Sequence, residues 1–141
     1  MMYKSKLIVL LSSVLWATAS LAGHAKPEAC PSINSIQAEG VSMSSEIVQG
    51  VYLTYNLNHY NTSYNWVFIV GPILAEDDDN AIVEGNKSLS MMSGNPNPED
   101  DGDGNWICEY TMNSEDMAAF AVEADDMISP LKMTRYFRKG R

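Results

Sequence analysis

The stretch that decides the fold is VYLTYNLNHYNTSYNWVFIV, residues 51–70. From Val51 to Tyr60 the side chains alternate with a period of two, which predicts a half-buried strand. Residues 61–63, Asn-Thr-Ser, have the composition of a turn. Residues 64–70 are rich in aromatic and β-branched types and are followed by Gly71-Pro72. The stretch therefore predicts an antiparallel hairpin at the centre of the protein.

The length of the turn determines which side chains of the hairpin share a face. With a three-residue turn, Tyr60 lies opposite Tyr64, and the strand period places Trp66 on the same face. His59 then lies on the other face, with the apolar core side chains Leu53, Tyr55, Leu57, Val67 and Ile69. A four-residue turn moves Trp66 to the side of His59. The sequence leaves open whether the aromatic face is exposed or covered by a helix.

The segments after the hairpin predict a helix, a strand and a final helix. Acids at 76–79 followed by apolar residues at helical spacing predict a helix that ends before Gly94, although Gly85 inside it costs about 1 kcal/mol relative to alanine. Residues 106–112 alternate and predict a strand. Ser129-Pro130 predicts the start of a short helix over 131–139. The fold class is then α+β: an antiparallel sheet with a central hairpin, one packed helix and a short C-terminal helix.

Three segments have weaker patterns. Residues 33–47 have sparse apolar positions, and we interpret them as one irregular strand. Residues 117–128 fit a helix or a strand equally well. The loop over 94–105 carries acids that resemble a calcium-binding loop, but Glu109 falls one position short of the closing ligand. A solvated acidic turn is the favoured interpretation of this loop, with weak calcium binding over 99–105 as the alternative.

The N-terminus has the pattern of a cleaved secretory signal. Lys4 and Lys6 precede a mostly apolar stretch of 13 residues, and small residues allow cleavage after Ala22 or after Ala25. A membrane anchor would need about 18 or more apolar residues, so we expect no membrane span. The mature chain, residues 23–141, has the size of one secreted or periplasmic domain. Its two cysteines predict a disulfide between Cys30 and Cys108.

The charge of the chain narrows its partners. The net charge is −9, and removal of Lys4 and Lys6 brings it to −11, which argues against nucleic acid as a partner. Most of the remaining cations lie near the C-terminus, among them Arg135 and Arg138. The motifs of common hydrolases, of phosphate-binding loops and of zinc proteases are missing, and His59 is the only histidine certain to remain after processing. We therefore expect a binding protein and no enzyme.

The aromatic face suggests a flat apolar ligand. Tyr60, Tyr64 and Trp66 would form a platform, and a tyrosine phenolate is a known ligand of ferric haem iron. We expect these three residues to contact haem, and Arg135 or Arg138 to contact its propionates. The alternative is a protein-interaction module without a small ligand, acting on a host or envelope protein, because an exposed apolar face would serve that role equally well.

Five short segments follow one another along the mature chain. They are Cys30-Pro31-Ser32-Ile33, Gly50-Val51-Tyr52 with Tyr55 and Tyr60, Trp66-Val67-Phe68-Ile69, Met92-Ser93-Gly94 with Pro96 and Pro98, and Trp106-Ile107-Cys108-Glu109-Tyr110. Their order resembles a family of small secreted hemin-binding proteins of intracellular bacterial pathogens. The resemblance covers most of the mature chain and implies export and hemin binding for iron acquisition. It identifies no ligand-binding residue.

Intact-mass spectrometry of the exported protein tests both the signal and the disulfide. We expect a chain that begins at Gly23 or Lys26, with a mass lower by two hydrogens than that of the reduced chain. Reduction and alkylation of the same sample should then label two thiols. A chain that keeps residues 1–22, or that labels without reduction, contradicts the prediction.

Overall fold

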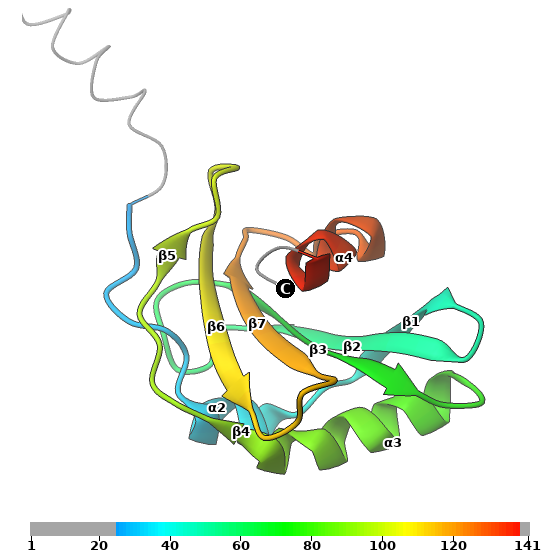
Figure 1. Ribbon diagram of the computed structural model, residues 1–141. Coiled ribbons are helices and arrows are strands. Elements are labelled where there is room, and N and C mark those ends of the chain that lie inside the picture. The colour runs from blue at the N-terminus through cyan, green and yellow to red at the C-terminus, as the bar shows by residue number, and fades with distance from the viewer. Residues whose placement is uncertain (1–24, 139–141) are drawn as a thin grey trace, which may run out of the picture.

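The computed structural model describes residues 25–138, so the predicted signal over 1–22 and residues 139–141 lie outside this range. The described chain forms a seven-stranded antiparallel sheet with helices on both faces (Figure 1). This confirms the predicted α+β fold. The elements in chain order are α2 (Ile33–Glu39), β1 (Met43–Val48), β2 (Val51–Asn58), β3 (Trp66–Leu74), α3 (Asp78–Ser88), the 3₁₀ turn η1 (Leu89–Met91), β4 (Met92–Ser93), β5 (Glu99–Asp100), β6 (Trp106–Met112), β7 (Ala118–Glu123) and α4 (Pro130–Arg138).

The hairpin of β2 and β3 lies near the middle of the sheet. The strand order is β1-β2-β3-β7-β6-β4, and β5 pairs with β6. Asn58 pairs with Trp66, which is the register of the three-residue turn. The ladder ends at that pair, however, so residues 59–65 form a longer loop than expected. A bulge in β3 near Gly71-Pro72 shifts the register beyond Thr54.

The two faces of the sheet bury different sets of side chains. Trp66, Phe68 and Val70 of β3 pack in one cluster with Ile36 of α2, and Ile73 packs with Ala81 of α3. The residues between them, Val67 and Ile69, face α4 together with Phe120 of β7. Residues 66–70 of β3 are all 0% exposed, because helices cover both faces of this strand. The predicted grouping of Trp66 apart from Val67 and Ile69 is therefore confirmed.

The structure decides two of the segments whose sequence patterns are weak, residues 33–47 and residues 117–128. Residues 33–39 form the helix α2, so the prediction of one irregular strand over 33–47 is wrong in its first half. The helix forms because the Ser32 hydroxyl accepts a hydrogen bond from the Ser35 N–H at 3.1 Å and Ile36 is fully buried against the sheet. Residues 118–123 form the strand β7, which resolves the choice between helix and strand. The reason is tertiary: β7 pairs with β3 on one side and β6 on the other.

The disulfide between Cys30 and Cys108 is present, with a Cα–Cα distance of 5.9 Å. It joins the segment before α2 to β6 and so holds α2 against the sheet. Such a bond is compatible with an extracellular or periplasmic location. Within residues 25–138, no helix combines the length and the apolar character needed to cross a bilayer.

Gly85 allows α3 to pack directly on β2. A Cβ atom at this position would lie 2.5 Å from the Thr54 side-chain oxygen and 2.9 Å from two of its carbons. Thr54 is itself 0% exposed, and its hydroxyl donates to the Val70 carbonyl at 3.1 Å. The glycine that the helix pattern predicts to be unfavourable is thus required by the contact between helix and strand.

We expect Gly85→Ala to destabilise the protein by about 1–3 kcal/mol, the usual cost of inserting a methyl group into a packed core. Without the contact, the change would stabilise the helix by roughly 1 kcal/mol. Urea unfolding of the mature protein measures the difference. As a control, Thr54→Ala in the Gly85→Ala background should recover part of the loss, because two of the three clashing atoms are removed. A stabilised single variant contradicts the close contact.

Candidate functional site

The loop of the central hairpin is organised by the Thr62 hydroxyl. This oxygen lies 2.7 Å from the His59 carbonyl and accepts hydrogen bonds from the Tyr64 N–H at 3.2 Å and the Trp66 indole N–H at 3.0 Å. One donated and two accepted bonds satisfy a hydroxyl group completely. Tyr60 has a φ of 50°, in the left-handed region, and this turn of the backbone places its side chain on the α2 side.

Tyr60 is buried in the core under α2. Its side chain is 2% exposed and packs in the same cluster as Ile36, Cys108 and Tyr110. Its hydroxyl has no hydrogen-bond partner among the described residues. Burial, with a smaller contribution from the charge of Glu39, raises the pKa of Tyr60 far above its usual value. This environment disfavours the phenolate form that binds ferric iron.

The other two aromatic candidates are covered to different extents. Trp66 is 0% exposed, whereas Tyr64 is half-buried. The two rings meet edge-on, with 6.5 Å between their centroids. Tyr64 lines a surface hollow of about 510 Å³ together with Glu28, Ala29 and residues 61–63. The aromatic face is therefore mostly covered by a helix, and Tyr64 is its accessible member.

The strand period predicts that His59 lies with the apolar core side chains, and this prediction is wrong. His59 is exposed, and its Nδ1 atom lies 3.0 Å from the Tyr64 carbonyl oxygen. The reason is that the ladder ends at Asn58, two residues before the end of the alternating pattern at Tyr60. The side chain therefore caps the hairpin loop at the surface.

The acidic loop after β5 binds α4. The Tyr136 hydroxyl donates to Asp101 at 2.9 Å, and the Lys132 ammonium donates to the Asn105 side chain at 2.8 Å. Arg135 lies 3.9 Å from the Asp103 carboxylate. The loop is thus an exposed acidic turn, as expected, that also contacts α4. Among the described residues, no cluster of three or more His, Cys, Asp or Glu side chains is placed to hold a metal ion.

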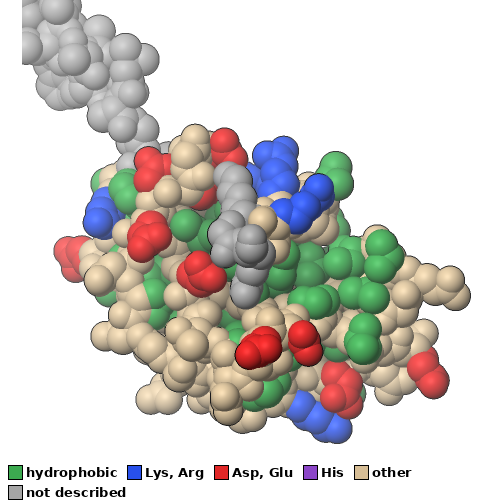
Figure 2. Space-filling view, in the orientation of Figure 1, with side chains coloured by type: hydrophobic (Ala, Val, Ile, Leu, Met, Phe, Trp, Pro, Cys, Tyr) green, Lys and Arg blue, Asp and Glu red, His purple; other side chains and the backbone are tan. Residues whose placement is uncertain are grey.

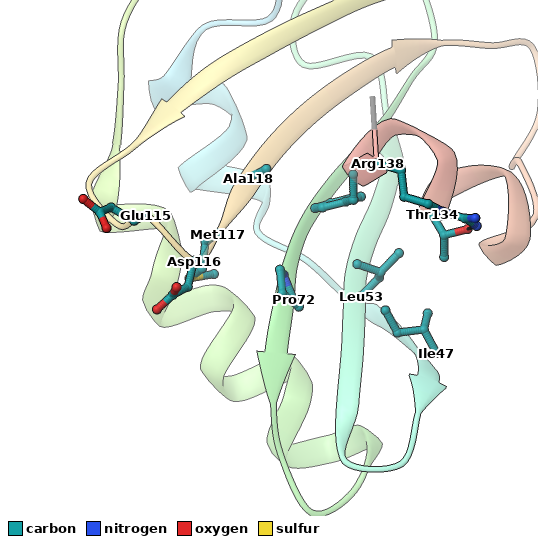
Figure 3. Close-up of a pocket in the computed structure, with 10 residues that line it drawn as sticks. Ile47, Leu53, Pro72, Glu115, Asp116, Met117, Ala118, Thr134 and Arg138 are labelled. Carbon is teal, nitrogen blue, oxygen red and sulfur yellow. Dashed lines mark hydrogen bonds between the residues drawn. The ribbon is translucent and has the colours of Figure 1, made fainter. Parts of the chain in front are cut away.

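The helix α4 covers only part of its face of the sheet. Met133 and Tyr136 are buried against β7, and Phe137 meets Phe120 edge-on at 5.1 Å. Nine residues of α-helix are about 13 Å long, whereas the nine residues of β3 extend about 30 Å. The uncovered remainder forms a groove of about 360 Å³ (Figure 3). Its lining residues are Ile47, Leu53, Pro72, Glu115, Asp116, Met117, Ala118, Thr134, Phe137 and Arg138.

The α4 groove, defined by those residues, has an apolar floor and charged ends. Leu53 and Pro72 form the floor, and Arg138 and Thr134 enter from α4. Figure 3 places Glu115 and Asp116 at the opposite end, in the turn between β6 and β7. Figure 2 shows apolar side chains gathered on the surface between α4 and the β1–β2 end of the sheet. A molecule with an apolar body and an anionic edge would be oriented by these charges.

The residues expected to contact haem are divided between two faces. Tyr60, Tyr64 and Trp66 lie on the side of α2, whereas Arg135 and Arg138 belong to α4 on the other side of the sheet (Figure 1). The structure does not bring the two groups together. No motif in the sequence indicates the floor of the groove. The one signal for it is that the predicted C-terminal helix is short compared with the strands that it must cover.

The comparisons with known proteins give one match. A family model described as a domain of unknown function, DUF4949, matches residues 29–136. The matched segment runs from just before Cys30 into α4. It includes most of the residues that line the hollow beside Tyr64 and most of those that line the α4 groove. No curated protein and no solved structure matches the chain.

We expect Tyr60→Phe to leave the free energy of unfolding unchanged or to raise it slightly, since it removes a buried hydroxyl without a partner. The matched variant Tyr110→Phe removes a hydroxyl that donates to the Pro31 carbonyl and should destabilise by about 1–2 kcal/mol. Urea unfolding at neutral pH measures both. Equal losses would show that the Tyr60 hydroxyl is hydrogen-bonded.

The free energy of unfolding of the variants Tyr60→Phe and Tyr110→Phe can also be compared at high pH. Burial raises the pKa of Tyr60 and Tyr110 in the folded state, so folding stability should decline as the pH rises above the ordinary tyrosine value of 10.0. Above that pH these two tyrosines lose their protons in the unfolded chain and keep them in the folded chain. Either variant removes one such group and should make the decline less steep.

Proposed function

This chain belongs to the DUF4949 family of domains of unknown function, and we propose that it is an exported protein that binds hemin for iron acquisition. The cargo would occupy the α4 groove. The observation that supports this is the half-covered apolar face of the sheet, with Arg138 at one end of the opening. The disulfide is compatible with export.

Hemin matches the groove in shape and charge. It is flat and largely apolar, and its two carboxylates lie along one edge. The apolar body would lie on Leu53 and Pro72, and a carboxylate would pair with Arg138. The acids Glu115 and Asp116 at the other end would repel a reversed orientation. The volume of about 360 Å³ is near the lower limit of roughly 300–1,000 Å³ for ligand pockets. Part of the cargo would therefore remain exposed, which suits a protein that later releases it.

The iron of hemin would find a ligand on the β6–β7 turn. Met117 borders the end of the groove and is half-buried, where it also packs against the α3 side of the sheet. A methionine thioether is an established ligand of haem iron. Tyr60 is a weaker candidate because its hydroxyl lies under α2. Tyr64 keeps access to solvent, but among residues 25–138 no cation lines its hollow, whose charged residue is Glu28. The groove therefore offers the better set of contacts.

Titration of the mature protein with hemin tests the proposal. We expect a sharpened Soret band that saturates at one hemin per chain. Thr134→Trp should abolish saturable binding by filling the groove. Arg138→Gln should weaken binding by roughly fivefold, the effect of losing one charge pair at the surface. Arg135→Gln is the matched control, because Arg135 belongs to the same helix but does not line the groove.

Two further variants locate the iron. Met117→Leu keeps the size of the side chain and removes the thioether, so it should shift the Soret maximum with little loss of affinity. Tyr60→Phe combined with Tyr64→Phe should leave the spectrum unchanged. Loss of the band in the double tyrosine variant alone would move the site to the hairpin loop. Absorbance that never saturates would show adsorption and contradict hemin binding altogether.

A further inference from the structure

The strand β1 ends the sheet with an open edge. It is first in the strand order and pairs only with β2 among the described strands. About half of the backbone N–H and C=O groups of such a strand point away from its partner. The six residues Met43–Val48 extend about 20 Å, long enough to pair with a segment of similar length. The other end of the sheet offers the two-residue strand β4.

The two sides of this edge differ in chemistry. On the α3 side, Glu46 is exposed, and Asp78 accepts a hydrogen bond from the Ser44 hydroxyl at 3.0 Å. On the α4 side, Met43 and Ile47 are half-buried and apolar, and Ile47 also lines the α4 groove. A strand added beside β1 would present alternate side chains to these two sides. Its matching sequence therefore has a period of two.

The negative charge on the α3 side is concentrated near Tyr52. Burial first, and then the carboxylates of Glu46, Asp78 and Asp77, raise the pKa of the Tyr52 hydroxyl. A second copy of this chain would bring the same acids against them, and like charges facing each other across a strand pair are destabilising. The edge therefore disfavours self-association and favours a cationic partner.

We propose that β1 binds an extended segment of another protein in which cationic and apolar residues alternate. The segment adds to the seven-stranded sheet as a further strand. Its cations face Glu46 and Asp78, and its apolar residues extend the surface of Met43 and Ile47. This inference rests on the sheet edge and is independent of whether hemin binds.

A capped hexapeptide that alternates lysine and valine serves as the probe, with the mature protein labelled for NMR. We expect saturable binding with amide shift changes concentrated in residues 43–48. A peptide of the same composition with three lysines followed by three valines should bind at least tenfold more weakly, because it cannot place cations on one side only. Equal binding of the two peptides would overturn the proposal, since it would show unspecific charge attraction.

Methylation of the peptide backbone tests strand pairing directly. One peptide carries N-methyl groups on its three valines and another on its three lysines. In a strand, alternate residues direct their backbone N–H groups to the same side, so either the valine or the lysine N–H groups point toward β1. The peptide methylated on those N–H groups should lose binding, and the other should keep it. Loss of fewer than threefold for both peptides would overturn the proposal.

Charge variants test the acidic side of the edge. Glu46→Gln and Asp78→Asn keep their hydrogen-bond acceptors, and each should weaken peptide binding about threefold at low salt. Glu109→Gln on β6 makes the same change in net charge far from β1 and should have no effect. An equal loss with Glu109→Gln, or dimerisation of the peptide-free protein through residues 43–48, would contradict the assignment.

Discussion

The register of β3 between β2 and β7 determines where nearly every other side chain lies. β3 is paired along both edges and is covered on both faces. A slip of one residue would put Val67 in the place of Trp66, and each of the two sets of apolar side chains would then point to the opposite face of the sheet. The Thr62 hydroxyl supports this register, because it holds the Trp66 indole at the first pair of the ladder. The packing of α3 through Gly85 then follows from the position of Thr54 in β2.

The two faces of the sheet are covered unequally, and this difference shapes the surface. On one face α2 and α3 act together, and the disulfide of Cys30 and Cys108 secures α2. On the other face α4 is the one helix within the described part of the chain, and the acidic loop holds it through Tyr136 and Asp101. The short helix leaves the groove open. Ile47 belongs both to that groove and to the apolar side of the β1 edge, so the two proposed surfaces adjoin.

The elements that sequence patterns predict well are those whose signals are local. The strand β6 has the predicted bounds, and the Ser129 hydroxyl accepts from the Lys132 N–H at the start of α4. The sequence pattern does not predict the helix α2, because this helix has seven residues and only Ile36 is fully buried, too few for a helical period to be visible. In β7 all six residues are buried, so no alternation remains to distinguish a strand from a helix.

The sequence by itself determined the alternation of β2 and β3, the cap of α4 at Ser129, the acidic charge and the predicted disulfide. The first two depend on residue type and on close neighbours in the chain, and the last two depend on residue counts. Tertiary structure alone decided that Tyr60 is enclosed under α2, that Gly85 is required and that Arg138 borders a groove. The reason is physical: burial and access depend on which distant segments meet and how far each one extends. No local pattern of residues records that a nine-residue helix stops short of the strands beneath it.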